Sequence, residues 1–148
     1  MSCACLNIGH RQRAIAYDST RVDALVQAAL PLCTAVSRRL GGPLASCANI
    51  DVSVIGTRAM ARVHRTFLNI PGATDVITFP YGEILVCAPV AAARAGEFQH
   101  ALTDEIALYI IHGLLHLAGH DDIDPQGSAR MAREQERILR AASGLIRK

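Results

Sequence analysis

The chain has 148 residues, of which 51% are hydrophobic, 19% charged and 4% aromatic, and its formal net charge is +2. This length suits one domain spanning residues 1–148, and the low charge density excludes a disordered acidic or basic tail protein. The same balance argues against an enzyme that grips duplex nucleic acid through a densely basic surface.

The five cysteines are an odd number and contain no C-x-x-C pair, so the sequence indicates neither a disulfide framework nor a cysteine-based zinc site. Apolar neighbours predict that Cys33, Cys47 and Cys87 are small buried thiols. The N-terminus lacks a basic segment followed by an apolar one, and the longest apolar stretch, 24–36, is too short to cross a bilayer. We therefore expect a reduced cytoplasmic protein that does not enter a membrane.

Hydrophobic periodicity predicts four strands and five helices. In chain order they are a strand within 3–17, a helix from 18–20 to 41–42, a strand at 48–55, a helix at 57–67, strands at 74–79 and 83–87, and helices at 89–96, 103–118 and 124–144. The concentration of helices near the end favours an α+β fold, with a small mixed sheet of about four strands covered by about five helices.

Local signals set the expected helix ends. Three of the predicted helices have N-cap candidates at Thr57, Thr103 and Asp124, and the first helix has them at 18–20. Glycines are expected to end helices at 41–42, 96, 119 and 144, and Pro31 is expected to kink the first helix.

Three of the six histidines fall within nine residues, at positions 112, 116 and 120. His112 and His116 are spaced i, i+4 on one predicted helix, so both imidazoles project from the same face and can reach one metal ion. Gly119 can stop the helix and let the chain fold back, which makes Asp122 and His120 the two candidates for a third ligand. The H-x-x-x-H-x-x-G-x-x-D run resembles the zinc-binding segment of extended zincin-type sites. The alternative is a helix whose histidines are packed in the core.

The ligand types limit the metal and the chemistry. One Zn²⁺ ion suits imidazole and carboxylate ligands with an open position for water, and Ni²⁺ or another divalent first-row metal also fits. The residue after the first histidine is Gly113, whereas H-E-x-x-H metalloproteases place their general base there, so the sequence argues against that protease class. Glu105 lies two helical turns earlier, where it either orients a ligand or is a solvated first-turn carboxylate.

Several motifs together resemble a known family, the YbeY-type rRNA maturation factors. Residues 112–122 read H-G-L-L-H-L-A-G-H-D-D, which is similar to the family's metal-site motif H-G-x-L-H-L-x-G-Y-D-H. The run A-T-D-V-I-T-F-P at 73–80 resembles the family's P-T-D-V-L-S-F-P, and 82–86 resembles its G-D-I-x-I strand. Met131 begins a pattern similar to the family's M-x-x-x-E, with Gln135 in place of the acid.

Two positions depart from the family pattern. Asp122 stands where the family has its third metal-binding histidine, and His120 stands where it has a tyrosine. Leu68 stands where the family carries an arginine linked to RNA cleavage. Arg65, three residues earlier, either substitutes for that arginine from the neighbouring helical turn or is a solvated side chain.

The resemblance implies a metal-dependent endoribonuclease that cleaves single-stranded RNA. His112, His116 and Asp122 would hold the metal, with Arg65 and His116 as the catalytic residues. The residues implied to support the site are Thr74, Asp75, His120 and Asp121. Asp75 would orient either a loop or a ligand histidine. Asp121 either supports the site or belongs to the helix end. Three arginines on the helix before the T-D-V strand are candidates for contacting RNA: Arg58, Arg62 and Arg65.

The resemblance also implies partners and a cellular role. These are rRNA, the small ribosomal subunit and a ribosome-assembly GTPase, with action in 16S 3′-end processing and ribosome quality control. Two alternatives remain open: a ribosome-associated metal-binding factor with weak or no nuclease activity, favoured by the missing family arginine, and a metal hydrolase that acts on small substrates.

Overall fold

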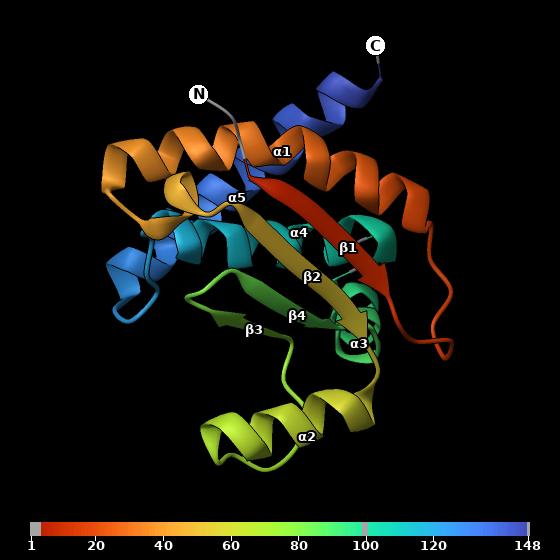
Figure 1. The fold of residues 1–148 in the computed structure, drawn as a ribbon. Helices are drawn as coiled ribbons and strands as arrows, with labels where there is room; N and C mark the ends of the chain where they lie inside the picture. Colours follow the sequence, from red (N-terminus) through yellow and green to blue (C-terminus); the bar gives the residue numbers. More distant parts are fainter. Residues whose placement is uncertain (1–3, 99–100, 148) are drawn as a thin grey trace.

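The computed structural model describes residues 4–98 and 101–147, with the side chains of 97 and 98 not described. Within these residues the chain forms four strands, five α-helices and one short 3-10 helix (Figure 1). In order they are β1 (Cys5–His10), α1 (Ser19–Leu40), η1 (Pro43–Ser46), β2 (Asn49–Ile55), α2 (Thr57–Leu68), β3 (Val76–Phe79), β4 (Glu83–Cys87), α3 (Ala88–Phe98), α4 (Leu102–Ala118) and α5 (Pro125–Ile146). The predicted α+β class is confirmed.

The four strands form one mixed sheet in the order β1-β2-β4-β3. β1, β2 and β4 run parallel, with Ile8 opposite Val52 and Val54 opposite Val86. The edge strand β3 pairs antiparallel with β4 through a tight turn, which places Thr78 opposite Ile84. The sheet is therefore mixed because a hairpin is added to a parallel core of three strands.

The helices cover the two faces of the sheet unequally. α1 and α4 pack on one face and α5 packs in turn against these two helices, whereas α2 lies on the other face, at the bottom of Figure 1. Alternate strand residues therefore point to different layers. Ile50, Val52 and Ile84 join the larger buried cluster with α1 and α4, and Ile77 and Leu85 join the smaller cluster beneath α2.

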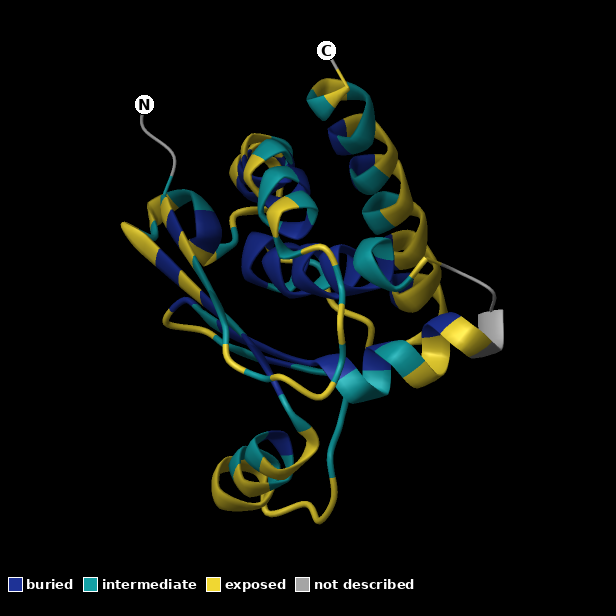
Figure 2. Ribbon diagram, turned by 90° about the vertical axis from the view of Figure 1, so that its right-hand side faces the viewer, coloured by how far each residue is buried: buried dark blue, intermediate teal, exposed yellow. Residues whose placement is uncertain are grey.

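α4 lies at the centre of the molecule. Most of its residues are buried because α1, α5 and the sheet all pack against it. In Figure 2 the helix through the middle is almost entirely dark blue, whereas α2, at the bottom, is mostly exposed or half-buried. A helix enclosed in this way offers a firm support for side chains that must keep a fixed geometry.

Two predicted N-caps are confirmed and two are wrong. The Asp18 and Asp124 carboxylates accept hydrogen bonds from the backbone N–H groups of Arg21 and Gly127. The N-cap of α2 is Gly56 rather than Thr57. α4 likewise begins before Thr103, with Ala101 as its N-cap and no side-chain cap.

Other boundaries also shift from the prediction. β1 covers only Cys5–His10 of the predicted 3–17 segment, whereas α1 continues through Pro31 and ends before Gly41 as predicted. Gly96 lies inside α3 and Gly144 inside α5. A glycine within a helix costs only about 1 kcal/mol relative to alanine, so the flanking residues can continue the helix through it. Cys33 and Cys87 are buried as predicted, but Cys47 is only half-buried.

None of the helices in the described part of the chain combines the length and apolar character needed to cross a membrane.

Candidate metal centre

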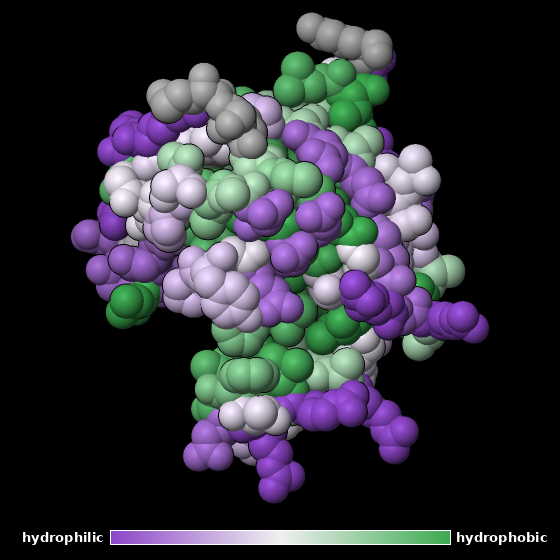
Figure 3. Space-filling view, in the orientation of Figure 1, coloured by the Kyte–Doolittle hydropathy of each residue, from purple (hydrophilic) through white to green (hydrophobic). Residues whose placement is uncertain are grey.

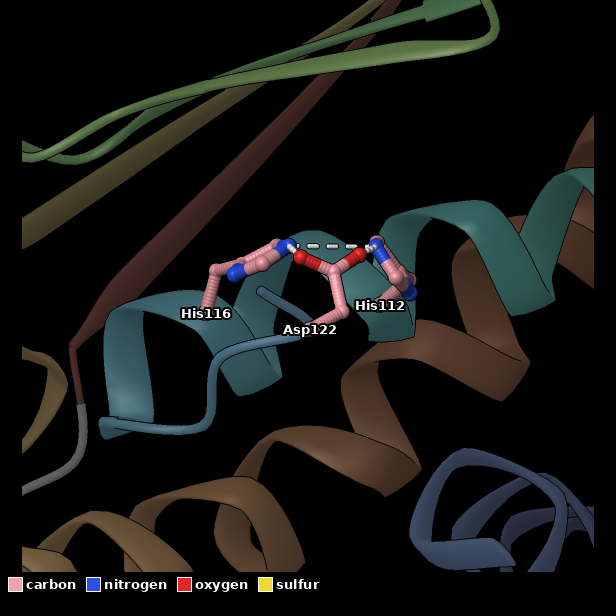
Figure 4. A group of neighbouring side chains, drawn as sticks. All are labelled: His112, His116 and Asp122. Carbon is pink, nitrogen blue, oxygen red and sulfur yellow. Dashed lines mark hydrogen bonds and ion pairs between the residues drawn. The ribbon is translucent and has the colours of Figure 1, made fainter. Parts of the chain in front are cut away.

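His112 and His116 lie one helical turn apart on α4, and both line a cavity beside this helix (Figure 4). Both side chains are half-buried, whereas most of the helix around them is buried. Their Nε2 atoms are 3.1 Å apart and their ring centroids 4.7 Å apart. The i, i+4 spacing thus converges two imidazole nitrogens on one point, as the sequence predicted.

Gly119 ends α4 and returns the chain toward these histidines. It adopts the left-handed conformation, with a φ of 115°, and its N–H donates to the His116 carbonyl. The segment that follows brings the Asp122 carboxylate to the imidazoles, with one oxygen 3.7 Å from His112 Nε2 and the other 3.8 Å from His116 Nε2. Figure 4 shows this carboxylate between the two rings. The three side chains offer ligand atoms that all lie within 4.8 Å of one another.

The outer nitrogens of both rings are already hydrogen-bonded. His112 Nδ1 donates to Gln135 Oε1 at 2.8 Å, and His116 Nδ1 donates to the His120 carbonyl at 3.2 Å. These acceptors assign the ring protons to Nδ1, which leaves the Nε2 lone pairs aimed at the same space as a carboxylate. The two Nε2 atoms and the Asp122 carboxylate are all acceptors, and none of them carries a proton to donate to the others. This set of converging lone pairs therefore fits a divalent cation.

Burial supports the neutral form of His116. Desolvation lowers the pKa of His116 below its usual value, and the neighbouring His112 imidazole lowers it further. A metal-binding imidazole must be unprotonated, so this environment favours ligation over protonation.

Gly113 explains why this helix lacks the glutamate of a metalloprotease. A Cβ atom at position 113 would lie 2.8 Å from Ile84 Cγ2 and 3.0 Å from Thr78 Oγ1. The position therefore faces the sheet at close range and has no room for a side chain. Packing, as well as chemistry, excludes a general base there.

A cavity of about 710 Å³ opens next to the histidines. It lies between α4 and the β3 edge of the sheet, and its lining includes Thr78, Pro80, Asp75, Arg94, His112, His116 and Asp122. A second cavity of about 230 Å³ shares Asp75, Arg94 and His112 with the first and is also lined by Glu105, Tyr109 and Gln135. The expectation of a solvated Glu105 is therefore wrong, because this side chain is only 7% exposed.

The residues predicted to support the site are placed as follows. Asp75 Oδ1 accepts the N–H of Val76 at 2.7 Å, and Thr74 Oγ1 donates to the same oxygen at 3.4 Å, so Asp75 orders the start of β3. His120 contributes its carbonyl to His116, while its own ring stays outside the three-residue group. Asp121 is exposed and accepts the N–H of Ile123 at 3.4 Å.

The three candidate RNA-contacting arginines lie elsewhere. Arg58, Arg62 and Arg65 are exposed on α2, which packs on the opposite face of the sheet from α4. None of the three is among the described residues that line the larger cavity. Leu68, in the last turn of α2, is 48% exposed and also outside that lining.

Sequence reasoning missed Arg94 and the contact made by Gln135. Arg94 lines both cavities and pairs with Asp75, its Nη1 3.3 Å from Oδ2. The one available signal was that Arg94 is the only arginine or lysine between Arg65 and Arg130. Gln135 was noticed only as a departure from a motif, although it orients His112.

Comparison with known proteins identifies the family. The family described as Endoribonuclease YbeY matches residues 7–143. The chain belongs to the YbeY family. Curated relatives with this name include those of Mycobacterium tuberculosis (strain ATCC 25618 / H37Rv), 34% identical, and Kineococcus radiotolerans, also 34% identical. The match to each spans 63% of the relative's own length, and covers 63% and 62% of this chain respectively.

The fold of this YbeY family member also matches a solved structure. The solution structure of TM1509 from Thermotoga maritima aligns with a TM-score of 0.60, covering 95% of this chain and 91% of that one. The sequence identity is 24%, so this likeness concerns the fold.

Proposed function

We propose that this chain is a metal-dependent endoribonuclease that cleaves single-stranded RNA. The observation that carries the proposal is the convergence of His112 Nε2, His116 Nε2 and the Asp122 carboxylate on one point beside a cavity, in a chain of the YbeY family. The cavity volume lies in the usual range for ligand sites.

His112, His116 and Asp122 would hold the ion, for which Zn²⁺ is the first candidate and Ni²⁺ or another divalent first-row metal the next. When bound, such an ion supplies Lewis-acid activation of water and polarisation of a phosphoryl oxygen. Gln135 and the His120 carbonyl keep both rings in the tautomer that ligation needs.

The remaining residues would bind and position the substrate. Thr78 and Pro80 form the wall of the cavity along the β3 edge, and Asp75 orders the loop that leads into β3. Arg58, Arg62 and Arg65 on α2 would hold RNA phosphates outside the cavity, which suits charge-based contact with a flexible strand. In this proposal Arg65 binds RNA at a distance from the three metal ligands, and His116 acts as one of those ligands.

The cellular role proposed is 16S rRNA 3′-end maturation and ribosome quality control in the cytoplasm. Contact with the small ribosomal subunit and a ribosome-assembly GTPase belongs to the same proposal. Family membership over residues 7–143 supports this assignment.

The experiment is cleavage of a labelled single-stranded RNA by purified protein. We expect cleavage that stops after treatment with a chelator and returns on addition of Zn²⁺ or Ni²⁺, and no cleavage by His116→Ala. Cleavage by His116→Ala at the wild-type rate would overturn the metal-dependent mechanism.

A second candidate is a ribosome-associated metal-binding factor with little nuclease activity. It is favoured by Leu68 at the position of the family arginine and by Arg65 on a helix outside the cavity. Metal binding together with salt-dependent RNA binding but without cleavage would support it. The absence of salt-dependent RNA binding would point instead to a metal hydrolase for small substrates.

A further inference from the structure

Arg94 lies beside the candidate metal centre, where it lines the same cavity as His112, His116 and Asp122. It lies in α3, and its side chain reaches over the space between Asp75 and α4. It lines both the 710 Å³ cavity and the 230 Å³ cavity, and it shares both linings with His112. The side chain is 53% exposed, so the guanidinium is open to a ligand that enters from solvent.

The charge of the larger cavity makes Arg94 the critical cation. Its lining carries two carboxylates, Asp75 and Asp122, and Arg94 is the only lysine or arginine among the described lining residues. With neutral imidazoles the lining has a formal charge of about −1, which a divalent ion would change to about +1. Without Arg94 the loaded cavity would be neutral and would lose its net attraction for a phosphodiester.

Asp75 holds the guanidinium in position. The ion pair uses Nη1 of Arg94 and Oδ2 of Asp75, while the other carboxylate oxygen is fixed by the N–H of Val76. A guanidinium carries five N–H donors in one plane, so it can keep this pair and still bind a phosphate oxygen with a second edge. The pair restricts the side chain before substrate arrives, which reduces the entropy lost on binding.

We propose that Arg94 binds the RNA phosphate that lies beside His112. It thereby supplies a positive charge to the substrate in place of the family arginine, whose position is occupied here by Leu68. This inference rests on the proposed endoribonuclease function. It assigns to α3 the substrate contact that the family resemblance assigned to the end of α2.

The test compares Arg94→Ala and Arg94→Lys with Arg140→Ala, a matched removal of one exposed arginine on α5. The first measurement is binding of a labelled 2′-O-methyl single-stranded oligonucleotide to zinc-loaded protein, with the oligonucleotide checked for integrity afterwards. We expect Arg94→Ala to weaken binding about tenfold or more, the usual cost of losing a hydrogen bond to a charged group. The salt slope should fall by about 0.7, the value for one lost phosphate contact in a single strand.

The second measurement is RNA cleavage under the same conditions. Arg94→Ala should lower kcat/KM by at least about tenfold and retain its zinc. Arg94→Lys should lose less activity than Arg94→Ala, and free guanidinium ion should partly restore cleavage by Arg94→Ala. Arg140→Ala should match wild type in all of these.

Three outcomes would overturn the assignment while leaving the proposed function intact. Arg94→Ala could bind and cleave RNA as Arg140→Ala does, it could lose zinc, or its lost activity could fail to respond to both lysine and guanidinium. If wild-type protein binds the oligonucleotide but cleaves no RNA, the proposed function fails, and the binding measurements still decide the role of Arg94.

Discussion

The two faces of the sheet differ in how completely they are packed. On one face α1, α4 and α5 enclose a large buried cluster, and the two candidate metal-binding histidines lie on α4, the most buried of these helices. On the other, α2 contributes Met60 to a cluster of five buried residues, while Phe67 remains 66% exposed. Figure 3 shows hydrophobic side chains gathered around α2 at the bottom of the view, with hydrophilic side chains projecting beneath them.

This difference separates two requirements of the proposed enzyme. Ligand atoms must keep their positions to within about half an ångström, which requires a support packed from several sides. A surface that contacts a flexible RNA strand through arginines requires only exposure and charge. The following predictions test that division, beginning with the largest expected effect.

The thiols of the two clusters should differ in reactivity. Burial raises the pKa of Cys33, in the larger cluster, to about 12, and burial also raises the pKa of Cys87, beneath α2. Because only an accessible thiolate is alkylated and Cys33 is fully buried, it should react with iodoacetamide at pH 8 at least about a thousandfold more slowly than an ordinary thiol. Timed quenching and mass spectrometry give the rates. Cys87 should react faster than Cys33 because it belongs to the smaller of the two buried clusters, and the reverse order would contradict the difference in packing.

Truncating isoleucines of neighbouring strands should destabilise the two layers unequally. Ile84 is fully buried against α4, whereas Ile77 is 6% exposed and faces α2. We expect Ile84→Ala to lower the free energy of unfolding by about 4 kcal/mol and Ile77→Ala by about 2 kcal/mol, since the enclosed site has less freedom to collapse. Urea unfolding followed by circular dichroism measures both. Equal losses would show that the layers are equally tight.

Removing one histidine from each layer should separate metal binding from structure. His116→Ala should weaken zinc binding by at least about a hundredfold, because even loss of an outer hydrogen-bond partner can cost that much. His64→Ala, which removes a hydrogen bond to the Gly72 carbonyl on the α2 side, should leave zinc binding unchanged. Competition with a chromophoric chelator gives the affinities. An equal loss in both variants would place the metal elsewhere.

Neutralising the α2 arginines should produce the smallest change. Replacing Arg58, Arg62 and Arg65 with serine should weaken single-stranded RNA binding about fivefold at moderate salt and reduce the salt slope by about 2. The matched control replaces three exposed arginines of α5, namely Arg130, Arg133 and Arg140. Fluorescence anisotropy measures binding at several salt concentrations. The same loss in both variants would mean that only the total charge matters, and that α2 has no special role.

Much of the fold followed from local patterns in the sequence. The order of four strands and five helices was confirmed, as were the caps at Asp18 and Asp124. The errors lie at helix starts such as Thr57 and Thr103, where the chain begins the helix one or two residues earlier than the polar residue suggests. Capping preferences are small free energies, and packing of a whole helix readily moves its first turn.

The sequence by itself determined the pair His112 and His116 and the stop at Gly119, because helical spacing and a left-handed glycine are local properties of the backbone. Only the tertiary structure decided that Asp122 completes the group, that Glu105 is buried, that Gln135 orients a histidine 23 residues away, and that Arg94 is the arginine beside the metal site. Gln135 and Arg94 reach the site from α5 and α3, and no local rule fixes which faces of two helices meet.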